Sequence, residues 1–475
     1  MNLTKEQQIV VDYAKQATSN ELILIDSVAG SGKTTLLKAI AEELGASPGL
    51  YLAYNKAIAT ESSKKFPKNI DCRTTHSLAY RAVVIPLKLK VGFFGPKQVD
   101  DRIPYKDKHL LSEDIREFCL SRFLEYEDYA EEYGRTNTEL ANKYLTFMAT
   151  GVIECSHDFY LKMFHKMLVQ NKINQTPYNL IMLDEAGDLN EVTLEIFKHL
   201  TGRIKVAVGD PHQNIYTFNY TINCFEQLAG QGTTFKLSKS FRVPDYIAEP
   251  IERFCKKYLN PDMQFKGISE NIPNTVKTRG YISRTNAGLI SKIIELNQER
   301  TPYGLVRKAQ EIFKLPLMIA GLKYQGKIYD PAYKHIQDDV DDWYENKDNL
   351  RVSYNSVLLY LRSKYDDDLG LKQAVNLVIK YGKPGIFSAY AEAKKHENTK
   401  QDFMLLTAHS SKGLEFDEVI LATDMNNSVD VVLQNLNDIP DYEINIAEKE
   451  SLNLYYVACT RALVRLRNAS HLIGV

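Results

Sequence analysis

The sequence offers no cysteine pattern that could hold a metal ion or a cluster. Its 475 residues contain six cysteines, which lie far apart and form no CxxC pair. A cysteine-based zinc site and an iron–sulfur cluster both need closer ligand spacing. We therefore expect reduced thiols at all six positions, which are Cys72, Cys119, Cys155, Cys224, Cys255 and Cys459.

Long apolar runs and a secretion signal are also lacking. No run of about 18 apolar residues could span a bilayer, and the amino terminus MNLTKEQQIVVDYAKQ lacks the charged start and apolar stretch of a signal peptide. The formal net charge of −1 provides no global basic field, so nucleic-acid binding would need a local groove. We expect a protein that is neither secreted nor membrane-bound and that works in the cytoplasm, either in the nucleoid or in an infected cell.

The apolar pattern indicates two α/β units, in a chain too long for one ordinary domain. Strand-like runs alternate with helical patterns, which favours parallel sheets. We predict strands within residues 22–25, 50–53, 180–183, 206–208, 404–406 and 419–422, and helices within 34–44 and 57–66. The predicted domains are residues 1–85 with 176–235, and 236–302 with 400–475, interrupted by insertions at 86–175 and 303–399.

The strongest local signal is SVAGSGKTT at residues 27–35, between a predicted strand and a predicted helix. Backbone amides of this glycine-rich loop can cradle phosphates, Lys33 can neutralise the β and γ groups, and the Thr34 hydroxyl can ligate magnesium. Ser27 replaces the first glycine of the strict signature but leaves the core of the loop intact. Because kinases and many ATPases share this loop, the loop by itself predicts only that the protein binds a nucleotide. A chance glycine-rich turn is the alternative.

A second signal is the apolar run Leu180 to Leu183, which delivers two carboxylates at its end. Asp184 would hold magnesium through water, and Glu185 would orient and deprotonate the attacking water. A strand that ends in two surface acids is the alternative. Together with the loop, this pair predicts a nucleotide hydrolase.

Further polar and aromatic residues stand at positions that suit this chemistry. In VGDPHQNIY, at residues 208–216, Gln213 can reach the γ-phosphate, while Tyr216 and Phe218 project toward a neighbouring groove. Arg242 and Arg461 are candidate arginine fingers, which complete charge neutralisation only when a second domain closes. Solvated surface arginines are the alternative.

Taken in order, these segments resemble the motif set of superfamily 1 DNA helicases of the UvrD, Rep and PcrA type. The matching segments are LTKEQ, SVAGSGKTT, AYNKA, TTHSLA, LDEAGD, VGDPHQNIY, SKSFR, LLTAHSSKGLEFDEV and NLYYVACTRA. VGDPHQ, THSLAYR and NLYYVACTRA are most similar to the motor region of the F-box DNA helicases and their viral and bacterial relatives, although no F-box segment is visible. The resemblance implies an α/β fold of two RecA-like parallel-sheet motor domains of the P-loop NTPase type, each interrupted by a mainly helical or mixed insertion.

The resemblance also implies roles at the matched positions. Gln7 would read the adenine edge, Phe241 would stack on the base in place of the usual tyrosine, and Glu415 would bond the ribose. The implied ATP-binding residues are Gln7, Ala29, Gly30, Ser31, Gly32, Lys33, Thr34, Thr35, Phe241 and Glu415. The implied catalytic residues are Lys33, Asp184, Glu185, Gln213, Arg242 and Arg461, with Thr34 and Asp184 as the Mg²⁺ site.

Contacts to single-stranded DNA are implied in the same way. Aromatic faces stack on bases at roughly 1–3 kcal/mol per base without reading sequence, while hydroxyl, amide and basic groups follow phosphates. A core aromatic or a solvated polar residue is the alternative at each position. The implied contacts are Asn55, Lys56, Thr75, His76, Tyr216, Phe218, Arg284, Asn286, Thr407 and His409.

The sequence departs from the family pattern at three further positions. Gly187 stands where relatives carry a glutamine that senses the γ-phosphate, so we hypothesise that Gly187→Gln raises DNA-stimulated turnover. Thr35 and Asn219 replace frequent arginines. None of these changes removes an essential catalytic group.

The resemblance predicts a monomeric, ATP- and Mg²⁺-dependent motor that moves 3′ to 5′ on single-stranded DNA, with weak unwinding because both insertions are short. Single-stranded DNA, single/double-strand junctions and proteins of replication or recombination are the expected partners, in replication, repair or recombination. We expect no appended nuclease domain, since the last motif lies close to Val475. The alternatives are a DNA-stimulated ATPase switch that clamps DNA or displaces bound proteins without processive unwinding, and a small-molecule kinase that ignores DNA.

Overall fold

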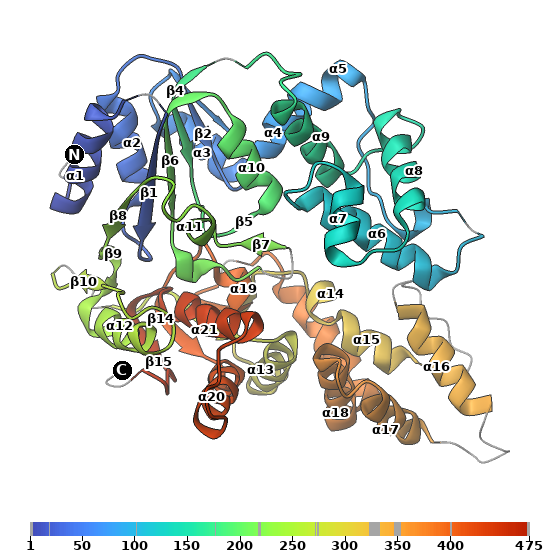
Figure 1. Cartoon of the computed structure of the whole chain (residues 1–475). Coiled ribbons are helices and arrows are strands. Elements are labelled where there is room, and N and C mark those ends of the chain that lie inside the picture. Colours follow the sequence, from blue (N-terminus) through green and yellow to red (C-terminus); the bar gives the residue numbers. More distant parts are fainter. Residues whose placement is uncertain are drawn as a thin grey trace. The chain divides into compact units, whose positions relative to one another are not determined.

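The chain forms two compact units in the computed structural model (Figure 1). The first unit comprises Met1–Arg242 and Asp262–Gly267, and the second comprises Val243–Pro261 and Ile268–Val475. The first unit thus extends beyond residue 235, where its end was expected. The structure describes residues 3–18, 20–100, 102–175, 177–216, 220–270, 272, 275–322, 333–345, 353–399 and 401–472.

The first unit is built on a six-stranded sheet with the order β3-β2-β4-β6-β1-β8, in which all neighbours run parallel. β8 pairs with β1 at one edge, placing Phe235 opposite Ile25, although the predicted boundary between the two α/β domains lies between residues 235 and 236, inside this strand. The strands are β1 (Glu21–Ser27), β2 (Gly49–Leu52), β3 (Ile70–Arg73), β4 (Tyr178–Leu183), β6 (Gly202–Gly209) and β8 (Thr233–Leu237).

Both faces of this sheet are buried, which explains the continuous apolar runs in its sequence. Successive side chains of a strand point to opposite faces. In β4, Leu180 and Met182 belong to one hydrophobic core, whereas Ile181 and Leu183 belong to the core on the other face. The first core includes residues of α1 (Lys5–Gln16), α2 (Lys33–Glu43) and α3 (Lys56–Lys65), and the second includes residues of α4 (Thr75–Ala79) and α10 (Glu191–His199).

The first insertion is helical where the structure describes it, and its helices gather beside α4 and α10 (Figure 1). It contains the end of α5 (Ile85–Leu87), η2 (Pro96–Gln98), α6 (Tyr105–Leu120), α7 (Tyr126–Tyr133), α8 (Thr138–Ala149) and α9 (His157–Val169). A π-helical turn, η1 (Tyr80–Val84), leads into it. The remaining short elements of this unit are β5 (Leu189–Asn190), η3 (Pro211–Gln213), β7 (Thr221–Ile222) and α11 (Cys224–Gln227).

A buried lysine on α9 leads us to expect that the stability of this insertion depends on pH. The ammonium group of Lys162 donates to the carbonyl oxygens of Ser121 at 2.5 Å and Phe123 at 2.8 Å, and burial lowers its pKa to about 7. An unfolded lysine titrates near pH 10.4. Between about pH 7 and 10 the unfolded state therefore binds more protons at this lysine than the folded state does. The contribution of Lys162 to the free energy of unfolding thus rises with pH in this window.

We expect the melting temperature of the native chain, relative to Lys162→Met, to rise by several degrees between about pH 7 and pH 10. Differential scanning fluorimetry across this range measures the difference. Lys166→Met is the matched control on the same helix, because its side chain makes a surface ion pair with Glu125. If the difference in melting temperature between the native chain and Lys162→Met does not change with pH, burial does not shift the pKa of Lys162.

The second unit contains a five-stranded sheet with the order β12-β13-β11-β14-β15, again with parallel neighbours. Its strands are β11 (Arg279–Ser283), β12 (Gly304–Leu305), β13 (Phe403–Thr407), β14 (Phe416–Leu421) and β15 (Ala462–Arg467). The two-stranded sheet of β9 (Lys239–Pro244) and β10 (Lys266–Ile268) lies mostly in the first unit.

Helices account for most of the rest of the second unit, including its insertion. Outside the insertion they are α12 (Asp245–Tyr258), α13 (Asn286–Glu299), α19 (Ala408–Ser411), α20 (Thr423–Asp438) and α21 (Ile446–Cys459). The described part of the insertion contains α14 (Ala309–Ile312), α15 (Lys314–Gly321), α16 (Lys334–Glu345), α17 (Tyr354–Lys364), α18 (Leu369–Ala393) and η6 (Lys394–His396). These helices share one apolar core with residues of α13, β12 and β13.

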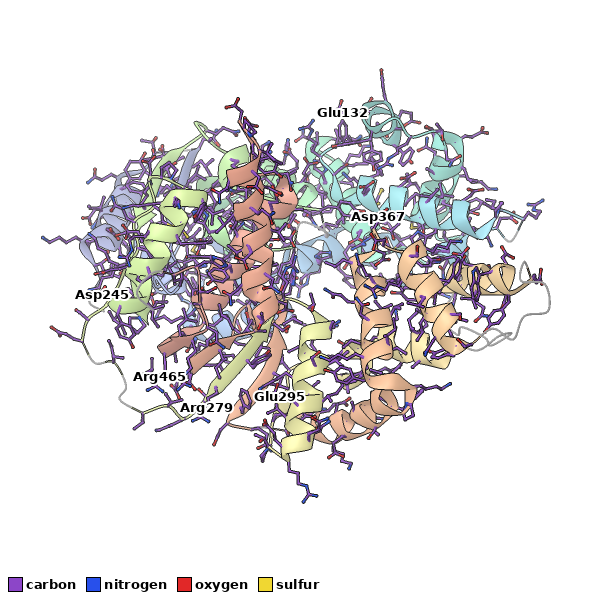
Figure 2. The ribbon with its side chains drawn as sticks, turned by 90° about the horizontal axis from the view of Figure 1, so that it is seen from below. Glu132, Asp245, Arg279, Glu295, Asp367 and Arg465 are labelled. Carbon is purple, nitrogen blue, oxygen red and sulfur yellow. The ribbon has the colours of Figure 1, made fainter. Side chains whose placement is uncertain are left out.

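A buried carboxylate joins three neighbouring strands of the second sheet. The register places Glu418 of β14 opposite both Arg279 of β11 and Arg465 of β15, and Figure 2 shows these two arginines near each other at one end of the sheet. Glu418 forms ion pairs with Arg279 at 3.2 Å, Arg465 at 3.2 Å and Arg467 at 2.8 Å. Three guanidinium groups thus compensate the desolvation of one carboxylate.

The predicted fold class is confirmed: both units contain a parallel sheet covered by helices, and the insertions are helical where they are described. Each predicted strand and helix also has a counterpart in the structure. All six cysteines are free, as expected. Among the described residues, none of the helices combines the length and the apolar composition needed to cross a bilayer.

Candidate active site

The glycine-rich loop joins β1 to α2 and presents polar groups that suit a phosphate. Gly30 and Gly32 both adopt left-handed backbone angles, with φ of 73° and 79°, and a Cβ on Gly30 would lie 2.5 Å from Cβ of Arg242. No side chain caps the amino end of α2, and the buried hydroxyl of Ser31 has no hydrogen-bond partner within the described chain. Backbone amides and a spare hydroxyl at a helix amino end fit an anion.

The serine that replaces the first glycine of the signature has a structural contact of its own. The Ser27 hydroxyl donates to the carbonyl oxygen of Gly209 at 2.7 Å and is buried. Gly209 is the last residue of β6, so this bond ties the start of the loop to the neighbouring strand. Ser27, which departs from the strict signature, therefore anchors the loop.

Lys33 lies among carboxylates at the carboxyl end of the sheet. Its Nζ is 3.1 Å from Oε2 of Glu185. Burial alone would lower the pKa of Lys33, but the charges of Glu185, Asp184 and Asp210 outweigh it and raise the pKa. The lysine is therefore firmly charged.

Asp184 is the more deeply buried of the two carboxylates that follow β4. Burial, followed by the charge of Glu185, raises its pKa, while Lys33 and a hydrogen bond from Tyr51 oppose this shift. The Tyr51 hydroxyl donates to Oδ2 of Asp184 at 2.5 Å. Carboxylates gathered at one point with a single lysine suit a divalent cation, because a cation would offset their mutual repulsion.

Gln213 is held next to this cluster by a third carboxylate. Its Nε2 donates to Oδ2 of Asp210 at 2.9 Å, and its backbone amide donates to the Asp210 carbonyl oxygen at 3.0 Å. The charge of Asp210 also acts on Lys33. The structure thus connects Gln213 to Lys33 through Asp210.

The residues assigned to the adenine base lie against the same loop. Gln7 Nε2 donates to the Ser31 carbonyl oxygen at 3.1 Å, and the Phe241 amide donates to the Gly30 carbonyl oxygen at 2.8 Å. The Phe241 side chain is 49% exposed, so its ring is open to stacking. Ala29 is buried, and its carbonyl oxygen accepts from Ser240 at 2.8 Å.

The remaining predicted nucleotide residues divide between the units. Thr34 and Thr35 lie in the first turn of α2. Arg242 belongs to the first unit, although the predicted boundaries placed it in the second domain. The second unit contains Glu415, exposed before β14, and Arg461.

Arg461 is not a solvated surface arginine. Its side chain is 1% exposed, and its Nε donates to the Val457 carbonyl oxygen at 2.9 Å, while Nη2 donates to the Thr460 hydroxyl at 3.1 Å. The solvated alternative is therefore wrong for this residue. These bonds fix the guanidinium at the junction of α21 and β15.

A pocket of about 170 Å³ beside the carboxylates contains three of the predicted DNA contacts. Thr75, His76 and Tyr216 line it together with Tyr54 and Asp184. Sequence reasoning missed Tyr54, whose side chain is 46% exposed. The sequence signal that could have identified Tyr54 is its aromatic ring within AYNKA, directly before the predicted contacts Asn55 and Lys56.

Two other predicted DNA contacts cap helices. Asn55 caps α3, accepting from the Ile58 amide at 2.9 Å, and Thr407 caps α19 in a reciprocal pair with Ser410. Lys56 is exposed on the first turn of α3.

The other predicted contacts lie mostly in the second unit. Burial lowers the pKa of Arg284, partly offset by Glu450 and Asp424, and Asn286 begins α13. His409 is 3.5 Å from Glu450 Oε1. Phe218 and Asn219 lie outside the described residues.

Two family models match the chain. The UvrD-like helicase C-terminal domain matches residues 162–468, and an AAA domain matches residues 8–219. The first match covers more than half of the chain and includes the Asp184 and Arg461 regions. The second includes the glycine-rich loop.

Two similar proteins are DNA helicases by name. F-box DNA helicase 1 of Gallus gallus is 25% identical over 523 residues, covering 100% of this chain and 50% of the relative. F-box DNA helicase protein 1 of Schizosaccharomyces pombe (strain 972 / ATCC 24843) is 26% identical over 527 residues, covering 98% of this chain and 57% of the relative. The chain thus spans about half the length of the curated relatives it matches.

Proposed function

The chain belongs to the UvrD-like helicase family, whose members are ATP-hydrolysing DNA helicases, and on this premise we propose that it is an ATP-driven motor moving 3′ to 5′ on single-stranded DNA. Its proposed substrates are single-stranded DNA and single/double-strand junctions, on which it acts as a monomer in replication, repair or recombination. Proteins of replication or recombination are its proposed partners. The two helicase relatives and the order of the sequence motifs support this proposal.

The observation that carries the proposal is the position of Asp184. This carboxylate acts on Lys33 in the charged cluster, and it also lines the pocket that contains Tyr54 and Tyr216. Asp184 therefore connects the residues proposed to bind phosphate with side chains suited to stacking on bases. Such a connection is what a DNA-stimulated hydrolase requires.

ATP and Mg²⁺ are the proposed ligands of the charged cluster. The loop amides and Lys33 would hold the phosphates, and Thr34 and Asp184 would hold the metal, which supplies electrostatic stabilisation of the phosphoryl oxygens when bound. Glu185 is placed beside Lys33 and would orient and deprotonate water. The spare Ser31 hydroxyl and the uncapped helix end support this assignment.

Tyr51 positions the proposed metal ligand, so its hydroxyl should affect the Mg²⁺ requirement. Tyr51→Phe removes the hydrogen bond to Asp184. We expect the Mg²⁺ concentration for half-maximal ATP hydrolysis to rise roughly 10-fold, within the 10- to 100-fold range of outer-shell substitutions. A Mg²⁺ titration of hydrolysis measures this. Tyr13→Phe, which removes a hydroxyl elsewhere in the same unit, is the control, and equal Mg²⁺ requirements in the two variants would exclude the positioning role.

The direct test of the proposed function is directional displacement of streptavidin from biotinylated single-stranded DNA. A motor that moves 3′ to 5′ removes streptavidin from the 5′ end in an ATP-dependent reaction and leaves it on the 3′ end. Glu185→Gln should abolish displacement, whereas Lys38→Ala should retain it because Lys38 lies outside the cluster, in an ion pair with Glu42. Displacement from the 3′ end would reverse the proposed polarity. Displacement from neither end, with ATP hydrolysis still stimulated by DNA, would favour a switch.

A further inference from the structure

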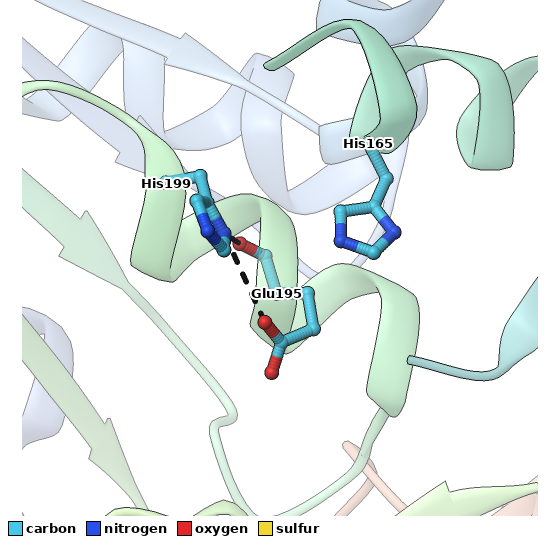
Figure 3. A group of neighbouring side chains, drawn as sticks. All are labelled: His165, Glu195 and His199. Atoms are coloured by element: carbon cyan, nitrogen blue, oxygen red, sulfur yellow. Dashed lines mark hydrogen bonds and ion pairs between the residues drawn. The ribbon is translucent and has the colours of Figure 1, made fainter. Parts of the chain in front are cut away.

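Helices α9 and α10 bring two histidines and a glutamate together, and none of the three is among the residues assigned to ATP or DNA (Figure 3). One ligand atom from each of His165, Glu195 and His199 lies within 4.8 Å of the others. Glu195 and His199 are four residues apart on α10 and therefore share one helix face. Nδ1 of His199 is 3.8 Å from Oε2 of Glu195.

His165 provides an independent indication that this group binds a ligand. It is 1% exposed, and its buried Nδ1 has no hydrogen-bond partner in the part of the chain that the structure describes. Buried polar atoms without a partner are rare and require an explanation. Figure 3 shows the His165 ring turned from α9 toward Glu195 and His199 on α10.

The charges around the three side chains leave ligand atoms available. Lys198 donates to Oε1 of Glu195 at 2.7 Å, so Oε2 is the oxygen nearer His199. The Lys162 ammonium is directed to the carbonyl oxygens of Ser121 and Phe123.

The tautomer of His199 is also fixed. Its Nδ1 lies 2.9 Å from the Glu195 carbonyl oxygen, which can only accept a hydrogen bond, so Nδ1 carries the proton and Nε2 carries the lone pair. Such a backbone bond commonly orients a metal-binding histidine. The His199 side chain is 38% exposed, so one side of the group is open to solvent.

We infer that His165, Glu195 and His199 form a binding site for a divalent transition metal ion, with Zn²⁺ as the ion that best suits two imidazoles and one carboxylate. Three protein ligands leave a fourth position for water at the open side. The site joins the last helix of the first insertion to α10, which comes after β4, the loop containing Asp184 and Glu185, and β5. The bound ion would therefore stabilise the contact between the insertion and the motor sheet, a role separate from the proposed hydrolysis.

The test is metal binding by the untagged full chain in excess Mg²⁺, by calorimetry with Zn²⁺ and by visible absorption with Co²⁺. We expect one Zn²⁺ per chain, competition between the two ions, and a melting temperature that rises with Zn²⁺. His199→Gln and Glu195→Gln should each weaken binding by more than the roughly 10- to 100-fold typical of outer-shell changes. Both residues are partly exposed, so these variants should fold. His109→Asn, which removes an exposed histidine of α6, is the control and should bind as the native chain does.

Two results would overturn the inference. One is no saturable binding of Zn²⁺ or Co²⁺ at micromolar concentrations. The other is unchanged binding in both His199→Gln and Glu195→Gln, which would assign the ion to other groups such as the free cysteines. Neither result depends on ATP hydrolysis or DNA binding, so the metal site and the proposed motor can fail independently.

Discussion

Lys33→Ala is expected to lower DNA-stimulated ATP hydrolysis by about 10²–10³-fold, the loss typical of removing one preorganised electrostatic contact in an active site. Lys33 begins α2 directly after the glycine-rich loop, and three carboxylates raise its pKa. The variant loses the cation that would face the β- and γ-phosphates and leaves Asp184 and Glu185 repelling each other. Hydrolysis with and without single-stranded DNA measures the effect.

Two further variants separate loss of charge from loss of fold. Lys33→Arg keeps the charge but not the compact ammonium group, so we expect partial activity. Lys38→Ala lies on the same helix in a surface ion pair and should hydrolyse ATP like the native chain. Native-like hydrolysis by Lys33→Ala would remove the glycine-rich loop from the mechanism. A third outcome is that Lys33→Ala loses hydrolysis while DNA does not stimulate hydrolysis by the native chain. This outcome would support the nucleotide site and contradict the proposed motor.

The parallel sheets could be predicted from sequence because their strands are buried on both faces. Leu180 to Leu183 form an unbroken apolar run, since alternate residues enter different cores. β8 lies at the sheet edge, and its residues alternate between partly buried and exposed before buried Leu237. That weaker pattern explains why the predicted domain boundary, between residues 235 and 236, falls inside this strand.

The glycine-rich loop was predictable because its chemistry lies in consecutive residues. The contacts that support it were not, because they join distant segments. Tyr51 and Asp184 are 133 residues apart, and Ser27 and Gly209 are 182 residues apart. No local pattern pairs such residues. The group of His165, Glu195 and His199 likewise depends on the packing of α9 against α10.

Gly187→Gln is expected to lower ATP hydrolysis, the opposite of the effect hypothesised from the family pattern. A Cβ on Gly187 would lie 2.5 Å from the Asp210 carbonyl oxygen and 3.1 Å from the adjoining carbonyl carbon. Both contacts are with backbone, which cannot rotate away as a side chain can. Moving Asp210 would disturb the hydrogen bond to Gln213 and the charge that acts on Lys33. Displacements of about 1 Å in an active site can cost on the order of 10²-fold in rate.

Gly187→Ala isolates the steric effect, because it adds Cβ without the amide of glutamine. If the close approach to Asp210 decides the outcome, alanine and glutamine should both lower hydrolysis and the melting temperature. Gly321→Ala is the matched control, since a Cβ there meets nothing within 4 Å. Lower activity in Gly187→Ala with higher activity in Gly187→Gln would show that the amide restores phosphate sensing despite the steric cost. Higher activity in both variants would mean that the Asp210 backbone moves at little cost. Gly187 would then limit turnover for a reason other than the steric contact with Asp210.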